Sequence, residues 1–137
     1  MSTRPKVLEF EVALDRDGAL SAEGCPPIEL PDEWTAEHLF LAALARCSLT
    51  SLRYHARRAN IQARASATSA GVVTKRQSDD RFAFVEIECR CEVELDPLPG
   101  EGEVRALLAK AERDCFIGAS LATKPQYAWR VNGTLLG

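Results

Sequence analysis

The cysteines carry the most distinctive chemistry in this chain. The stretch EHLFLAALARC, residues 37 to 47, ends in Cys47 ten positions after a glutamate, and ERDCFIGASL, residues 112 to 121, contains Cys115. A cysteine either packs as a small apolar side chain or, where a cation or dipole stabilises its thiolate, acts as a nucleophile. Arg46 adjoins Cys47 but points about 100° away around a helix, so an activating charge has to come from elsewhere. Both interpretations stay open on the residues alone.

The other three cysteines are predicted to have no chemical role. Cys89 and Cys91 lie two positions apart in an alternating stretch, so both point inward from a strand and fit small buried apolar residues. Cys25 lies in a proline-rich loop. We predict no metal site, because there is no CxxC pair and the chain has two histidines, His38 and His55. An odd number of cysteines also argues against a complete disulfide framework.

The composition is that of an ordinary globular protein and predicts one domain over residues 1–137. Apolar residues make up 46% of the 137 residues and charged residues 27%, enough to build a core. The net charge of -3 gives no basic excess, which argues against a nucleic-acid partner. No apolar segment suits a signal peptide or a bilayer span, so we expect a cytoplasmic protein without a membrane partner.

The first third of the chain is predicted to form short strands. Residues 7–14 alternate, with Leu8, Phe10, Val12 and Leu14 on the inward face. DRDG, residues 15–18, predicts a tight turn into a second strand over about 19–22. The proline-rich stretch 25–34 predicts an irregular crossover with a short strand at 28–30.

A long helix is predicted over residues 36–59, which hold no glycine or proline. Its first half is apolar on all sides and should be buried on all sides. A chain of this size has little material to enclose such a helix, so we expect a homodimer in which two sheets surround two helices.

The rest of the chain completes an α+β fold, an antiparallel sheet packed around the long helix. We predict a strand over 61–76, a longer strand over 82–95, a helix from about residue 103, and a final strand over 126–136 with a turn at Asn132-Gly133. Cys115 is placed on the apolar stripe of the helix from residue 103.

The order of these elements and the residues around both thiols resemble the OsmC/Ohr family, small thiol peroxidases named for osmotically induced protein C and organic hydroperoxide resistance. TAEHLFLAALARC resembles the segment of the first reactive cysteine, with Glu37 and Cys47 at the family spacing. Arg16 in DRDG matches an arginine in a hairpin turn, and Cys115 occupies the place of the second cysteine. The likeness spans nearly the whole chain.

The chain departs from the family pattern next to both thiols. Thr35-Ala36 replaces Asn-Pro before the glutamate, Phe116 replaces a proline, Gly118 replaces a serine, and Arg46 stands where a small residue is common. An alternative therefore stays open: a protein of this fold that binds a small molecule without peroxidase turnover.

The resemblance implies a mechanism. Cys47 would attack an organic hydroperoxide and Cys115 would resolve the sulfenic acid as a disulfide. Arg16 would stabilise the thiolate and the peroxide oxygens, and Glu37 would orient the guanidinium. No bound cofactor is implied; a dithiol or a lipoylated protein would be the external reductant.

An apolar pocket is expected beside the two thiols, because neighbouring residues are large and apolar. Its residues would be Phe40, Leu44, Phe116 and Ile117. Ordinary core packing is the alternative interpretation of these four.

Overall fold

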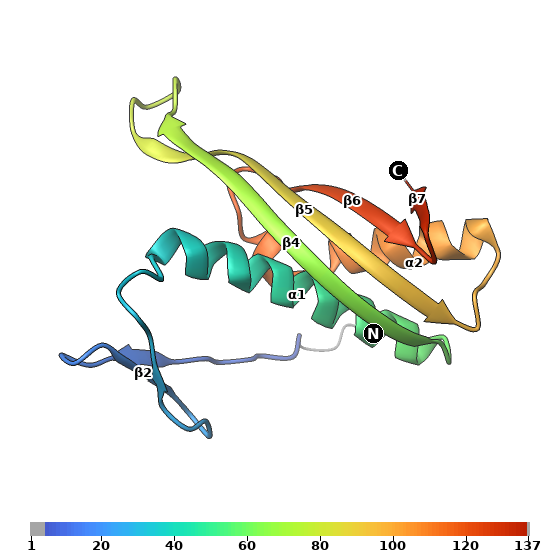
Figure 1. Cartoon of the computed structure of the whole chain (residues 1–137), viewed down its shortest axis with the longest axis horizontal. Coiled ribbons are helices and arrows are strands. Elements are labelled where there is room, and N and C mark those ends of the chain that lie inside the picture. The colour runs from blue at the N-terminus through green and yellow to red at the C-terminus, as the bar shows by residue number, and fades with distance from the viewer. Residues whose placement is uncertain (1–4, 137) are drawn as a thin grey trace. The chain divides into compact units, whose positions relative to one another are not determined.

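The computed structural model describes residues 5–136 and divides the chain into two compact units. The first unit ends at Ala36, and the second begins at Glu37. Figure 1 traces both units from blue to red. Each unit is built from its own elements, and both thiols of interest lie in the second.

The first unit is a small antiparallel sheet of three strands. They are β1 (Val12–Leu14), β2 (Ala19–Ala22) and β3 (Ile28–Glu29), with β2 in the middle. The predicted DRDG turn is confirmed. The Asp15 carboxylate accepts the backbone N–H groups of Asp17 and Ala19, both at 2.9 Å, and Gly18 takes a φ of 86°.

The strand expected over residues 7–14 is shorter than predicted and its apolar face is not buried. Only residues 12–14 are strand, and Phe10 is 78% exposed. Leu8, Val12 and Leu14 are also exposed. Three short strands have no second layer within their own unit, so periodic apolar residues find nothing there to pack against.

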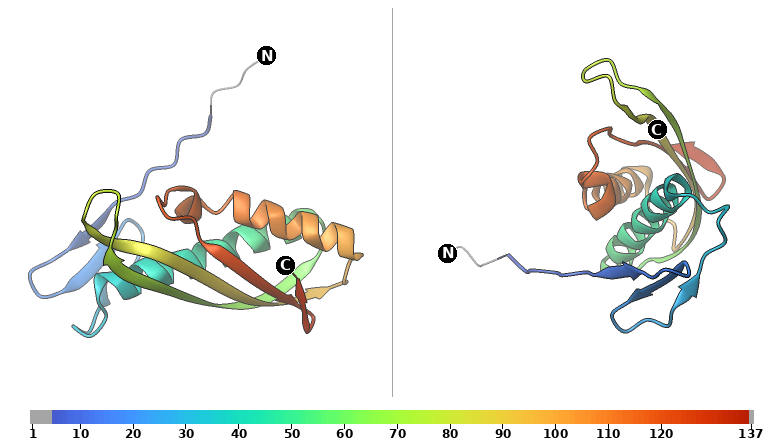
Figure 2. Two further views of the ribbon diagram at one scale, coloured as in Figure 1. Left: turned by 90° about the horizontal axis from the view of Figure 1, so that it is seen from above. Right: turned by 90° about the vertical axis from the view of Figure 1, so that its left-hand side faces the viewer.

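The second unit is a four-stranded sheet with helices on one face (Figure 2). The strands, in sheet order, are β4 (Gln62–Lys75), β5 (Phe82–Asp96), β6 (Gln126–Val131) and β7 (Thr134–Leu136). The helices are α1 (Ala36–Arg58), α2 (Glu101–Arg113) and the short α3 (Phe116–Ala119). Among residues 5–136, no helix is both long and apolar enough to cross a bilayer.

Strand β5 is the centre of this sheet and follows its predicted alternation. Its inward side chains are almost fully buried, and the glutamates between them are exposed. The buried residues are Ile87, Cys89, Cys91, Val93 and Leu95. This face packs into one core with α1 and α2.

The sheet is mixed, whereas the sequence predicted an antiparallel one. β5 and β6 are parallel, with Cys91 opposite Trp129. Parallel neighbours require a crossover, and here residues 97–125, which include α2 and α3, supply it. The final stretch is two strands, joined by the expected turn at Asn132-Gly133, where both residues have positive φ.

Helix α1 is as long as predicted, but a single chain buries only one stripe of it. Six residues are buried, namely Leu44, Ser48, Leu49, Ser51, Leu52 and Ala56. Ala42 and Ala43 in the apolar first half are exposed. Burial on all sides is therefore not reached within one chain.

Candidate active site

Cys47 is half-buried near the middle of α1. Its Sγ accepts the backbone N–H of Ile117 at 3.5 Å, although the two residues are far apart in the sequence. The folded chain therefore brings the first thiol against the segment that follows the second.

Cys115 is fully buried and lies at the start of α3 rather than on α2. The sequence placed it on the α2 stripe; the helix instead ends at Arg113, and Cys115 itself is extended, with φ -75° and ψ 111°. Its Sγ caps α3 by accepting the backbone N–H of Gly118 at 3.3 Å. Because α2 ends at Arg113, Cys115 is not on the apolar stripe of that helix, and its thiol lies next to Ser48 of α1.

The two thiols interact, and their environment raises the pKa of Cys47. Burial is the largest cause of the higher pKa, and the hydrogen bond with Cys115 adds to it. The Ile117 N–H favours the thiolate and lowers the pKa in part. A nucleophilic thiolate at neutral pH would require a further stabilising charge.

A hydroxyl pair that the sequence analysis missed links Cys115 to the sheet. The Ser48 Oγ lies 2.9 Å from the Tyr127 hydroxyl and 3.7 Å from the Cys115 Sγ. Burial raises the pKa of Tyr127, so this phenol stays protonated. The signal in the sequence was two serines, Ser48 and Ser51, on a largely apolar stripe of the helix next to Cys47.

Cys89 and Cys91 are buried in the sheet, as predicted, and they are in contact. Their Sγ atoms lie 3.8 Å apart, and Ser69 Oγ donates to Cys89 at 3.7 Å. The hydrogen bond between the thiols lowers the pKa of Cys89 and raises that of Cys91, while burial opposes ionisation of both. Cys89 is therefore the thiol of this pair that ionises first.

Arg16 and Glu37 belong to different units of the chain. Arg16 lies in the turn between β1 and β2, as predicted, and thus in the first unit. Glu37 is in the first turn of α1. Since α1 is unbroken to Cys47, the ten residues between them rise about 15 Å, and Glu37 does not reach this thiol directly. That Arg16 acts on Cys47 stays a prediction.

The four residues predicted to form an apolar pocket have different degrees of exposure. Leu44 is fully buried in the core, and Phe116 is 61% exposed. Phe40 and Ile117 are partly buried against the core. Phe40 stacks on Phe84 with ring centroids 4.6 Å apart and lines a pocket of about 320 Å³ that is mostly apolar.

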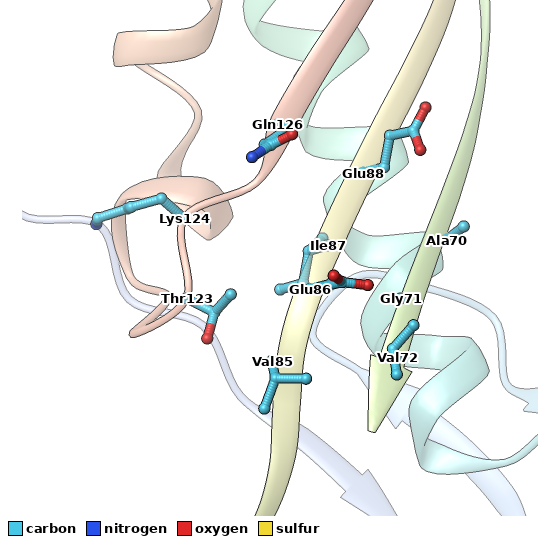
Figure 3. Close-up of a pocket in the computed structure, with 10 residues that line it drawn as sticks. All are labelled: Ala70, Gly71, Val72, Val85, Glu86, Ile87, Glu88, Thr123, Lys124 and Gln126. Carbon is cyan, nitrogen blue, oxygen red and sulfur yellow. The ribbon is translucent and has the colours of Figure 1, made fainter. Parts of the chain in front are cut away.

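The second unit also has a pocket of about 710 Å³ lined by Arg53 and residues of β4 and β5, and two further pockets. One of about 520 Å³ is next to Cys115, because Gly118 and Tyr127 form part of its wall. The other, of about 380 Å³, is lined by residues of β4, β5 and the segment before β6, none of them a cysteine (Figure 3). The first of these adjoins the second thiol through Gly118 and Tyr127.

A hydrogen-bonded His–Asp pair joins α1 to the residue after α2, close to the second thiol. His55 Nε2 lies 2.7 Å from Asp114 Oδ2, and Arg113 also binds this carboxylate. The hydrogen bond with Arg113 is the largest cause that lowers the pKa of Asp114, and the hydrogen bond with His55 lowers it further. Asp114 precedes Cys115, so the pair holds the break between α2 and α3 against α1.

We expect Asp114→Asn to destabilise the protein at neutral pH and to lose that effect in acid. A carboxyl group whose pKa is lower in the folded protein than in the unfolded chain stabilises the fold at pH values above the unfolded pKa, about 3.9. That contribution to stability is lost as the pH falls through the pKa of Asp114 in the folded protein. The urea midpoints of wild type and variant should therefore differ at pH 7 and converge as the pH falls below the pKa of Asp114 in the folded protein. Asp80→Asn is the control, because Asp80 is exposed in a surface pair with Lys75. Equal midpoints at pH 7 would contradict this role for Asp114.

The comparisons with solved structures show the fold. An OsmC-like protein of unknown function from Vibrio cholerae has a TM-score of 0.76 and 14% identity, covering 90% of this chain and 99% of that one. An OsmC-like protein from Mycoplasma pneumoniae has a TM-score of 0.68 and 16% identity, covering 93% and 99%. The organic hydroperoxide resistance protein OhrB of Bacillus subtilis has a TM-score of 0.54 and 18% identity, covering 90% and 96%.

The sequence comparisons identify the family. The comparison with curated proteins found no match. The family model described as OsmC-like protein matches residues 30–130, which include both Cys47 and Cys115. With most of the sequence matched and the same fold in the solved relatives, the chain belongs to the OsmC family.

Proposed function

We propose that this protein is a thiol peroxidase that reduces organic hydroperoxides to alcohols through Cys47 and Cys115. The observation that carries the proposal is the contact between a half-buried and a fully buried thiol. Cys47 interacts with Cys115 and accepts the N–H of Ile117, two residues beyond it. A nucleophile that reaches solvent and a protected thiol beside it suit attack followed by resolution.

In the proposed first step, the Cys47 thiolate attacks the terminal oxygen of the hydroperoxide. A sulfur–oxygen bond forms, the O–O bond breaks, and the departing alkoxide takes a proton to become the alcohol. Arg16 stabilises both the thiolate and the developing negative charge, oriented by Glu37. Because Glu37 lies about 15 Å along α1 from Cys47, it acts through Arg16 of the same chain or of a second copy.

In the second step, Cys115 attacks the sulfenic sulfur of Cys47. A disulfide forms and water leaves. The Cys115 proton passes to the departing hydroxide, which leaves as water, and Ser48 Oγ, 3.7 Å from the sulfur and bonded to Tyr127, can relay it. A dithiol, free or lipoyl-bound on a protein, then reduces the disulfide by exchange.

The substrate preference follows from the apolar surroundings. The mostly apolar pocket beside Phe40 suits a hydrocarbon group better than water-like hydrogen peroxide. We include Phe40, Ile117 and the exposed Phe116 as substrate contacts, with Leu44 supporting them from the core.

We also propose that the protein works as a cytoplasmic homodimer. In residues 7–14 of the first unit, five large apolar side chains are at least half exposed in the single chain, namely Val7, Leu8, Phe10, Val12 and Leu14. Apolar surface on this scale favours association, and a second copy would cover it and the exposed side of α1.

The test is to map disulfides after one equivalent of oxidant. Reduced protein is treated with an organic hydroperoxide or with hydrogen peroxide, free thiols are blocked, and peptides are identified without reductant. We expect a rapid link between Cys47 and Cys115, formed faster with the organic substrate. If both thiols stay free, the peroxidase proposal fails.

Cys115→Ala is expected to leave the first attack intact and to block resolution. The Cys47 sulfenic acid should persist and then over-oxidise, so the variant should lose activity within about one turnover while wild type with dithiol continues. Mass measurement of Cys47 at successive times checks this, with Cys25→Ser as the matched control because Cys25 is exposed. Sustained turnover by Cys115→Ala would show that another group resolves Cys47.

A binding protein without turnover is the second candidate. The observation that favours it is the raised pKa of Cys47, which opposes thiolate formation. The mapping experiment separates the two functions, because a binder would bind the apolar compound and keep Cys47 and Cys115 reduced.

A further inference from the structure

The sulfur of Cys115 is closed off from solvent and lies between two hydrogen-bond donors. The residue is 0% exposed. Its Sγ accepts the backbone N–H of Gly118 at 3.3 Å, and the Ser48 Oγ lies 3.7 Å away. A thiol attacks another sulfur as its thiolate, and a buried thiolate is costly unless it accepts hydrogen bonds. Because water does not reach this sulfur, the protein itself has to stabilise the charge.

The neighbours of the Ser48 hydroxyl leave its proton free for Cys115. A serine oxygen has one proton to donate and two lone pairs that accept. Cys89 donates to this oxygen at 3.9 Å, and the Tyr127 hydroxyl lies 2.9 Å away, where it can donate as well. With both lone pairs used in this way, the single Ser48 proton points to the Cys115 sulfur.

We propose that Ser48 is a catalytic residue that stabilises the Cys115 thiolate, and that Tyr127 is a positioning residue that orients the Ser48 hydroxyl. This inference rests on the proposed function and deepens it, because Cys115 is the resolving thiol of that cycle. Together with the Gly118 N–H, Ser48 gives the buried sulfur two hydrogen bonds. Hydrogen bonds of this kind favour the charged form of a group over the neutral one.

Ser48 acts in the resolution step without being consumed. Cys115 loses its proton, its sulfur attacks the sulfenic sulfur of Cys47, the sulfur–oxygen bond breaks and hydroxide leaves. The proton and the hydroxide form one water. The Cys115 sulfur is oxidised and the sulfenic sulfur is reduced, so the disulfide accounts for all the electrons.

The same hydroxyl should act again when the disulfide is reduced. Cys47 is half-buried and Cys115 is fully buried, so an external dithiol meets the Cys47 sulfur and Cys115 leaves as a thiolate. This step is the reverse of an attack by Cys115 on a mixed disulfide at Cys47. Both directions share one transition state, so a hydrogen bond from Ser48 to the partly charged sulfur assists both.

The test measures how fast Cys115 attacks a mixed disulfide on Cys47, and it needs no hydroperoxide. The parent protein is Cys25→Ser, which removes the exposed thiol. Dithiodipyridine, a small aromatic disulfide, modifies Cys47 and releases one coloured thione, and the attack by Cys115 releases a second. In Ser48→Ala we expect the second release to be about three- to tenfold slower at neutral pH, because a lost hydrogen bond to a charged group is partly offset by a more nucleophilic thiolate.

The pH profile of the second release distinguishes stabilisation of the thiolate from simple packing. The rate in Ser48→Ala should reach its midpoint at a higher pH than in the parent, and at alkaline pH it should equal or exceed the parent rate. Tyr127→Phe should move the midpoint in the same direction by less, since Ser48 keeps its proton and loses only its orientation. A loss of the same size at every pH would overturn the proposal, because Ser48 would then only hold Cys115 in place.

Ser51→Ala is the matched control for Ser48→Ala. Ser51 is also a buried serine of α1, but its hydroxyl donates to the Ala111 carbonyl oxygen at 2.8 Å rather than to a thiol. Its loss should lower stability without moving the pH midpoint of the second release. A shift in Ser51→Ala as large as that in Ser48→Ala would assign the effect to any lost hydroxyl of this helix and contradict the inference.

The ionisable groups around Cys115 come from several elements. They are Cys47 on α1, Cys89 and Cys91 on β5, and Tyr127 on β6. Asp114, which precedes Cys115, is bound to Arg113 and His55. The reagent occupies Cys47, and Cys89 is the group that shares Ser48 with Cys115. Cys89→Ala should move the midpoint much less than Ser48→Ala; an equal shift would place the controlling charge on Cys89 and refute the role of Ser48.

Hydroperoxide kinetics then separates this inference from the peroxidase itself. If the parent consumes hydroperoxide and forms the disulfide, while Ser48→Ala resolves at the same rate with the same pH midpoint, the peroxidase stands and the role of Ser48 is refuted. If no hydroperoxide is consumed, but Ser48→Ala still slows the second thione release and shifts its midpoint, the peroxidase is refuted and the role of Ser48 stands. Circular dichroism establishes that each variant is folded.

Discussion

Cys47→Ser is expected to lower organic hydroperoxide reduction by roughly three orders of magnitude or more. The serine hydroxyl keeps the size of the side chain, but at neutral pH it has no ionised form that attacks an O–O bond. Residual activity should not depend on the external dithiol, because no disulfide forms. The measurement is kcat/KM for an organic hydroperoxide with excess dithiol, for wild type and variant.

The matched control for this result is Cys25→Ser. Cys25 is an exposed thiol in the first unit, and its loss should leave kcat/KM unchanged. If Cys47→Ser keeps full activity while its fold is intact, Cys47 is not the nucleophile. Equal losses in both variants would point to a general effect of thiol removal.

Arg16→Ala is expected to slow the attack on hydroperoxide by about 10²- to 10³-fold and to raise the pKa of Cys47 further. Burial already raises this pKa, so without a cation the thiolate fraction at neutral pH is small. The guanidinium would also stabilise the departing oxygen, and loss of one such donor has an effect of this size. The pH dependence of Cys47 alkylation gives the pKa, and stopped-flow kinetics gives the rate.

Two controls define what Arg16 contributes. Arg16→Lys keeps the charge but loses the planar pair of donors, so its rate should lie between wild type and Arg16→Ala. Arg57→Ala removes an exposed arginine from the end of α1 and should change neither quantity. An unchanged thiol pKa in Arg16→Ala would mean that the turn between β1 and β2 does not bring its cation to Cys47.

Periodicity predicted the elements that a single pattern defines. β5 alternates without interruption and α1 holds no glycine or proline, and both lie within one or two residues of the prediction. The parallel pairing of β5 with β6 was not predicted, because strand direction depends on the path of residues 97–125 and not on alternation. The exposed face of the first unit shows the same limit, since alternation indicates an apolar face but not what covers it.

The candidate site was predicted residue by residue but not as a network. Residue type alone favoured a packing role for Cys115. The position of Cys115 at the start of α3 was not predicted, because no glycine or proline in the sequence marks the end of α2. Ser48 and Tyr127 were missed because the pattern puts a serine on the buried stripe of α1 but does not show which partner its hydroxyl meets. Cys89 and Cys91 were correctly placed inside, yet the contact of Cys89 with Ser48 depends on how α1 crosses the sheet.

The crossover between β5 and β6 also has a consequence for the order of folding. The hairpin of β4 and β5 forms from neighbours in the sequence, and α1 precedes it directly. Residues 97–125 have to close as a loop before β6 can pair, and non-local contacts of this kind form late because closure costs entropy. During synthesis, Cys47 is therefore placed on its helix before Cys115 arrives. For that interval, until the crossover docks, the nascent chain holds the first thiol without its partner.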